Sequence, residues 1–189
     1  YSMWWIIIIV DYYNYTQCKD FAVNQVEYMK GLIKQVDDLT DEKGNTNFPF
    51  NFVDWPCAGS SEAYDGTRAI TIIAIKKAIE FLTSFNEDTS LAKKVLEKLL
   101  RLPINCGDKK QVIGLKYLAL GEISDEEYQT LICGGARGLS TFMSYYILKA
   151  IASFDKPRAI EIMKEYYGKM LEKGATTFWE DFDMSWVKN

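Results

Sequence analysis

The chain has 189 residues, 48% hydrophobic and 14% aromatic, which is enough to bury a sizeable core in one domain. It carries 22 basic against 26 acidic residues, a net charge of −4, and has no long Lys/Arg run, which argues against nucleic acid as a partner. The complete lack of histidine excludes histidine-based triads, histidine general bases and histidine–metal sites. Acid–base chemistry must therefore use Asp, Glu, Tyr, Lys or Cys.

The four cysteines are widely spaced and include no Cys-x-x-Cys pair, which argues against a structural zinc site. We expect neither a metal nor a cofactor. The spacing favours free, buried thiols and leaves a disulfide open. The most apolar run, residues 4–10, is too short to span a bilayer and follows no basic region, so we expect neither a membrane partner nor a signal peptide. The cysteines are Cys18, Cys57, Cys106 and Cys133.

The first half of the chain is predicted to be helical except for one extended segment. Residues 3–16 indicate a buried helix that is apolar nearly all round, with a short buried strand as the competing interpretation of the isoleucine run. Residues 19–38 show an apolar stripe with a period near 3.6, typical of a surface helix. In residues 48–56 aromatic side chains alternate between prolines, which predicts an extended segment. Further helices are expected at 62–86, apolar on most sides and internal, and at 90–101.

The second half is predicted to contain four more helices. Residues 109–120 form the first, and Ser124 with Glu127 forms a capping box that begins the second. Residues 139–154 form an aromatic-rich helix, whose Tyr145 and Tyr146 we expect in the core. Residues 157–173 begin with a proline in the first turn. The buried face expected for this last helix consists of Ile160, Met163, Tyr167, Met170 and Leu171.

These elements predict an all-α fold built from helix pairs. An apolar inner helix is followed repeatedly by an amphipathic outer one. Two architectures fit: a helical-repeat solenoid, or a toroid of helical hairpins around a central pit. The irregular, aromatic and acidic connections Phe50–Ser61 and Thr176–Asp183 favour the toroid, because solenoid turns are usually short and polar.

The segment Gly174–Asp183 carries the most informative pattern. Gly174 follows a strongly helical stretch and suits a left-handed residue just after the helix. Trp179 beside Glu180 offers an apolar face for stacking and an acid–base group, as a sugar site requires. The alternative interpretation is a helix-ending loop whose aromatic side chains cap the core.

Several motifs, in this order, together resemble the catalytic domain of glycoside hydrolase family 78, the inverting α-L-rhamnosidases. The Gly-Ala-Thr-Thr-x-Trp-Glu element is the most specific, and the resemblance covers essentially the whole chain. The motifs are Ser2-Met3-Trp4-Trp5-Ile6 with Asp11-Tyr12-Tyr13, Asn51-Phe52-Val53-Asp54-Trp55-Pro56, Leu139-Ser140-Thr141-Phe142 with Tyr145-Tyr146, and Gly174-Ala175-Thr176-Thr177-Phe178-Trp179-Glu180.

The resemblance implies a six-hairpin (α/α)6 toroid. This chain has room for about four hairpins, so residues 1–189 are expected to be a partial catalytic domain that lacks the first and last hairpins. The family's acidic motif, which carries the general acid, would precede Tyr1, and no Asp or Glu precedes Asp11. We therefore expect these residues to be inactive alone. We also expect self-association, because an incomplete toroid exposes apolar inner-helix surface.

The resemblance assigns the general base to Glu180, which would deprotonate the attacking water. Inversion requires the two carboxylates to be about 6.5–9.5 Å apart to admit that water. Trp55 and Trp179 are candidate stacking platforms, and Asp54 is a candidate acceptor for sugar hydroxyls. The alternative for Asp54 and Trp55 is a turn anchored by a buried tryptophan. Trp4 and Trp5 are further candidates for the substrate pit, with core packing as the alternative.

The expected function is hydrolysis of terminal α-L-rhamnosyl linkages by a bacterial glycoside hydrolase, with a rhamnose-containing carbohydrate as partner. Two alternatives stay open. Other six-hairpin enzymes cleave other glycosides or unsaturated uronides, and a non-catalytic helical scaffold would bind peptides or proteins. The sequence leaves the glycan, the linkage and the compartment open.

Overall fold

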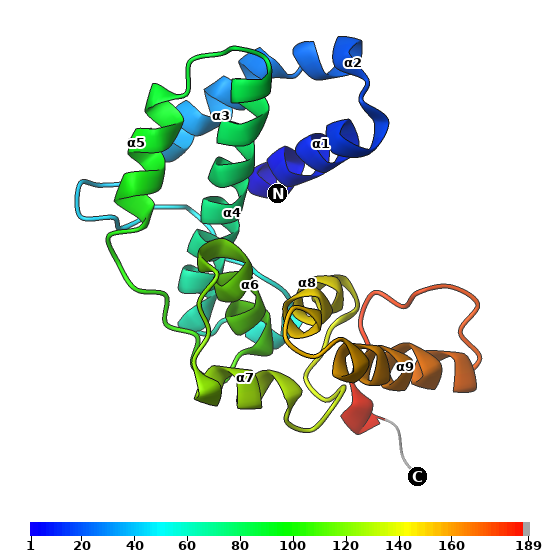
Figure 1. Ribbon diagram of the computed structural model, residues 1–189. Coiled ribbons are helices and arrows are strands. Elements are labelled where there is room, and N and C mark those ends of the chain that lie inside the picture. The colour runs from blue at the N-terminus through cyan, green and yellow to red at the C-terminus, as the bar shows by residue number, and fades with distance from the viewer. Residues whose placement is uncertain (187–189) are drawn as a thin grey trace. The chain divides into compact units, whose positions relative to one another are not determined.

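A computed structural model describes residues 1–186 of the chain (Figure 1). These residues are helical and contain no β-strand, which confirms the all-α prediction. Their only strand-like pairing is one isolated bridge between Thr40 and Thr46. No helix within them is both long and apolar enough to cross a bilayer. The chain divides into two compact units, which are described separately.

Unit 1 comprises Tyr1–Phe50 and Arg68–Pro103. The isoleucine run lies in a helix and not in a strand. The helix expected over residues 62–86 belongs to unit 1 from Arg68 onward, and its first residues belong to unit 2. The helices are α1 (Ser2–Thr16), α2 (Lys19–Val23), α3 (Val26–Asp38), α4 (Glu62–Ser84) and α5 (Ser90–Leu99).

Two expectations for this unit were wrong. The predicted single helix over 19–38 is two helices, because the side chains of Asn24 and Gln25 bond to the carbonyls of Asp20 and Phe21 and compete with the helical pattern. The first helix is buried on one side only: Ile6, Ile7, Ile9 and Val10 are buried, whereas Ile8 is 59% exposed.

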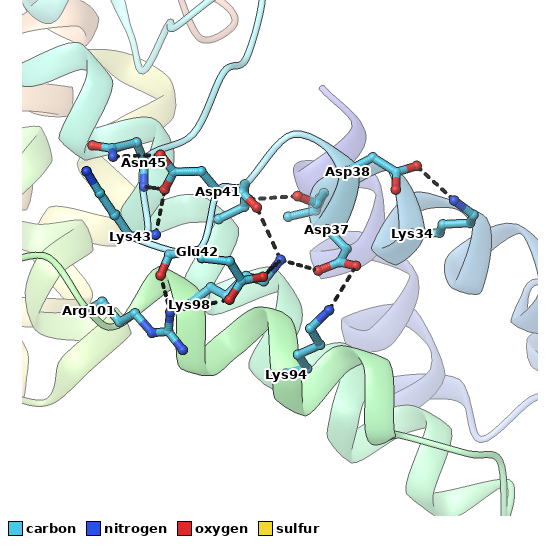
Figure 2. A network of polar contacts seen from close by, with 12 residues as sticks. Lys34, Asp37, Asp38, Asp41, Glu42, Lys43, Asn45, Lys94, Lys98 and Arg101 are labelled. Carbon is cyan, nitrogen blue, oxygen red and sulfur yellow. Dashed lines mark hydrogen bonds and ion pairs between the residues drawn. The ribbon is translucent and has the colours of Figure 1, made fainter.

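A buried lysine organises the polar part of unit 1 (Figure 2). Lys98 of α5 is 5% exposed, and its Nζ lies 2.8 Å from Oδ1 of Asp37 and 3.1 Å from Oε1 of Glu42. It also donates to the carbonyl of Thr40 at 3.2 Å. The ammonium therefore joins α5 to the end of α3 and to the turn that follows it. Each of its three protons has an acceptor, as a buried charge requires.

Unit 2 comprises Asn51–Thr67 and the chain from Ile104 onward. In it, α6 packs against α7 and α8, and α8 packs against α9 (Figure 1). Gly114 permits the close approach of α6 to α8, since a Cβ there would lie 3.3 Å from the Cα of Ile147. The helices are α6 (Lys110–Leu120), α7 (Asp125–Ile132), α8 (Thr141–Ala152) and α9 (Lys156–Glu172), with the short 3-10 helices η1 (Trp55–Cys57) and η2 (Met184–Trp186).

Local signals at the helix ends are confirmed. Ser124 and Glu127 form both bonds of the capping box, 3.1 and 3.0 Å long. The left-handed glycine after the last helix is also present, with φ of 87° at Gly174. The thiol prediction holds for Cys57 and Cys106, which are free and buried; Cys18 and Cys133 are free but exposed.

Of the buried face predicted for α9, only Met170 is buried and Tyr167 is half-buried; the other three residues are exposed. The face that packs inward consists of Ala159, Ile162, Tyr166 and Met170. Ile160, Met163 and Leu171, which belong to the neighbouring stripe, are 39%, 42% and 69% exposed. The helix carries two apolar stripes side by side, so period alone does not select between them.

Candidate functional site

The segment after α9 begins with a Schellman turn. The N–H of Gly174 bonds to the carbonyl of Leu171 at 2.9 Å, and the N–H of Ala175 bonds to the carbonyl of Met170 at 3.0 Å. These bonds provide donors for carbonyls in the last turn of α9 that have no donor within the helix. The chain then turns back along α9, as the orange-to-red trace in Figure 1 shows.

Tyr166 holds the returning segment in place. Its hydroxyl donates to the carbonyl of Phe182 at 2.8 Å and lies 3.4 Å from Oγ1 of Thr141 in α8. The rings of Tyr166 and Phe182 pack edge to face, and both residues are buried. Burial raises the pKa of the Tyr166 hydroxyl to about 12, so it remains a proton donor at neutral pH. The segment is thereby fixed against α8 and α9.

Successive side chains of this segment face two different cavities. Phe178 and Glu180 line one, and Trp179 and Asp181 line the other. Phe182, which follows Asp181 directly, also lines the second cavity. These four consecutive residues therefore contribute side chains to both cavities.

The first cavity has a volume of about 400 Å³ and is walled mainly by aromatic rings. The Tyr167 ring packs edge to face on Phe178, with centroids 5.3 Å apart, and its hydroxyl lies 2.5 Å from Oγ of Ser144. Glu180 is the one carboxylate that lines this cavity within residues 1–186. The lining residues are Thr141, Phe142, Tyr145, Tyr146, Tyr167, Phe178 and Glu180.

The second cavity, of about 340 Å³, is lined by Lys173, Trp179, Asp181, Phe182 and Trp186. Trp179 is half-buried, and its ring packs edge to face on the buried ring of Phe182 at 5.6 Å. Trp186 lies in η2 and is 60% exposed. The predicted stacking platform Trp179 therefore does not share a cavity with Glu180.

Asp54 and Trp55 lie in the first irregular connection of unit 2. Asp54 is 7% exposed; its Oδ1 accepts the N–H of Trp55 at 2.8 Å, and its Oδ2 accepts the hydroxyl of Ser140 at 2.5 Å. Trp55 is 54% exposed and packs edge to face on Phe52. Neither residue lines the Glu180 cavity, but Ser140 immediately precedes Thr141, which does.

Trp4 and Trp5 lie in α1, in the other unit, and both are half-buried. The Trp5 ring packs edge to face on Tyr28, with centroids 4.7 Å apart. This contact is the one expected from a packing role. A place for either indole in a substrate pit stays a prediction.

Sequence reasoning missed most of the aromatic wall. Tyr145 and Tyr146 were expected in the core, whereas Tyr145 is 58% exposed and both line the cavity. The spacing of Phe142, Tyr145 and Tyr146 places them on one side of α8. This spacing was the feature of the sequence that could have indicated the aromatic wall. Tyr167 and Phe178 come from other elements and could be placed only by the fold.

The described residues contain no cluster of three His, Cys, Asp or Glu side chains that would hold a metal ion. The side chains that line the first cavity offer aromatic rings and the carboxylate of Glu180. Aromatic faces stack on the C–H faces of a sugar. A carboxylate accepts sugar hydroxyl protons or takes a proton from water. No protein-family model, curated protein or solved structure matches the chain.

Proposed function

We propose that the chain is part of a glycoside hydrolase that resembles the inverting α-L-rhamnosidases and belongs to a six-hairpin (α/α)6 toroid. One observation carries the proposal. The carboxylate that the sequence motif nominates as general base, Glu180, lies on the wall of a cavity formed by five aromatic side chains. The consecutive helices α8 and α9 pack together, as the two helices of a hairpin do.

In this mechanism Glu180 removes a proton from water as the water oxygen attacks the anomeric carbon. The glycosidic C–O bond breaks, and a general acid protonates the departing oxygen. Glu180 is the single carboxylate that lines the cavity within residues 1–186, so the acid must come from elsewhere. The rings contact the apolar faces and the 6-methyl group of rhamnose.

The test is hydrolysis of p-nitrophenyl α-L-rhamnopyranoside by the complete natural polypeptide that contains these residues. Glu180→Gln should lower kcat by about 10²–10⁴-fold, the usual worth of a general base, with a small change in KM. Glu172→Gln, which alters an exposed carboxylate near the end of α9, is the matched control and should retain activity.

Azide distinguishes a lost base from a damaged fold. Azide is an anionic nucleophile that needs no deprotonation, so it should restore turnover in Glu180→Gln and give a glycosyl azide of inverted configuration. A Glu180→Gln variant with undiminished turnover would remove Glu180 from the mechanism. A variant that loses activity without rescue would assign Glu180 a structural role.

A further inference from the structure

The second cavity has a different chemical character from the first. Its walls combine the two indoles of Trp179 and Trp186 with one ammonium, Lys173, and one carboxylate, Asp181. Lys173 caps the end of α9, Trp186 lies in the short helix η2, and Trp179 and Asp181 lie in the segment between them. The cavity is open to solvent, and its volume of about 340 Å³ lies near the lower end of the range of small-ligand sites, about 300–1,000 Å³.

The two charged side chains are available to a ligand. Within residues 1–186, neither Lys173 nor Asp181 forms an ion pair or a side-chain hydrogen bond. The nearby Lys169 is different, because its Nζ pairs with Glu172 at 2.5 Å. Trp179 is held by its contact with Phe182, so one stacking surface is already fixed in position. A preformed surface lowers the entropy cost of binding.

We propose that this cavity binds a hexuronate residue of a glycan. The indoles would stack on the C–H faces of the pyranose ring, the Lys173 ammonium would pair with the C6 carboxylate, and the Asp181 carboxylate would accept ring hydroxyls. A neutral sugar leaves the ammonium without a partner. A phosphate group carries about −1.5 to −2 charges at neutral pH, against −1 for a carboxylate, so Asp181 repels it more strongly. A monoanionic, hydroxyl-rich ring matches both side chains at once.

The choice of a saccharide rests on the proposed function, whereas the choice of an acidic one rests on Lys173 alone. Because Trp179 and Asp181 line one cavity and Phe178 and Glu180 line the other, the uronate site and the hydrolytic site would share one segment of the chain. A glycan that carries both a neutral deoxy-sugar and a uronate would engage both cavities.

Binding is measured on the complete natural polypeptide by calorimetry and by the indole N–H signals in NMR. The probes are methyl β-D-glucuronide, its neutral methyl ester and methyl β-D-glucoside. The uronide should bind about two- to fivefold more tightly than either neutral probe at low salt, and added salt should reduce the difference. It should shift the indole signals of Trp179 and Trp186 and leave those of Trp4, Trp5 and Trp55 in place.

Three variants separate charge from stacking and from folding. Lys173→Gln should remove the preference for the uronide while weak binding of all three probes persists. Trp186→Phe should weaken all three, and because Trp186 is 60% exposed the fold should survive. Lys164→Gln, at an exposed lysine earlier in α9, should change nothing. Equal affinity for the three probes, or an undiminished preference in Lys173→Gln, would overturn the proposal.

The result of the hydrolysis assay is independent of the result of the uronide-binding measurement. If Glu180→Gln keeps full activity but the uronide shifts Trp179 and Trp186, the proposed base is wrong and the uronate site stands. If the base is confirmed and the uronide produces no such shift, the uronate site is wrong and the hydrolase stands.

Discussion

The hydroxyl of Ser140, at the N-terminal cap of α8, donates a 2.5 Å hydrogen bond to Oδ2 of Asp54, which lies 86 positions earlier in the chain. Both side chains are buried. The bond links the irregular segment that contains Asp54 and Trp55 to helix α8. Helix α8 supplies part of the aromatic wall of the first cavity. A negative group also suits the positive end of a helix dipole. Two motifs identified separately in the sequence, one with Asp54 and one with Ser140, therefore meet at the start of α8.

Ser140→Ala should lower the free energy of unfolding by about 1.5–3 kcal/mol, because it removes a hydrogen bond to a buried carboxylate. Chemical denaturation measures the change. The matched control is Ser153→Ala. The Ser153 hydroxyl donates to the carbonyl of Lys149 at an exposed position, so its removal should change the free energy of unfolding by less than about 0.5 kcal/mol. In Asp54→Asn the cost of Ser140→Ala should shrink, since the carboxylate is gone; fully additive effects would mean that the two side chains do not interact.

Tyr166→Phe should lower the free energy of unfolding by about 1–3 kcal/mol, because it leaves the buried carbonyl of Phe182 without its donor. The pKa of this hydroxyl is raised from 10 to about 12, so its contribution is complete below pH 10 and is lost as the pH rises toward 12. The stability difference between wild type and variant, measured by denaturation at a series of pH values, should therefore be constant to pH 10 and then narrow. Tyr15→Phe, at an 88% exposed position, is the control and should show neither effect.

The Asp37–Lys98 contact predicts a dependence on acid. The hydrogen bond from Lys98 holds the pKa of Asp37 below its usual 3.8, and the charges of Lys98 and Lys94 act in the same direction against burial. The stabilisation is therefore complete above pH 3.8 and disappears as the pH falls through the lower value of the folded state. The stability difference between wild type and Asp37→Asn should be constant at neutral pH and should vanish in acid.

Asp38→Asn is the matched control for this acid dependence. Asp38 forms an exposed ion pair with Lys34, whose side chain is 68% exposed. Removing this pair should therefore change the free energy of unfolding little at any pH. Denaturation monitored by circular dichroism from pH 7 to acid measures both variants. Parallel curves for wild type and Asp37→Asn through the acid range would show that Asp37 does not titrate with folding.

Features that depend on neighbouring residues were predictable from the sequence. The capping box of Ser124 and Glu127 and the left-handed Gly174 follow from a few adjacent positions, and both are present. The all-α class follows from apolar residues that recur with a helical period over long stretches of the chain. The helix break at Asn24–Gln25 was missed, because side-chain bonds to the preceding turn outweigh a continuous apolar stripe.

Features that depend on distant partners were not predictable. Lys98 is buried because Asp37 and Glu42, about 60 positions away, supply its acceptors. In the candidate site, Glu180 was nominated by a local motif, whereas Tyr167 joins it only because the chain turns back after α9. Trp179 was expected to share a site with Glu180, but the two neighbours line different cavities, which a local motif does not show.

Two glycines near the end of α9 should respond in opposite directions to the same substitution. Gly174 has φ of 87°, so Gly174→Ala should cost about 1–2 kcal/mol of folding stability. Gly168 lies within the helix, and a Cβ there would meet no atom within 4 Å, so Gly168→Ala should gain about 0.5–1 kcal/mol. Thermal and chemical denaturation measure both changes. Loss of stability in Gly168→Ala would place an unrecognised contact on that side of α9, and a neutral Gly174→Ala would show that the Schellman turn does not end this helix in solution.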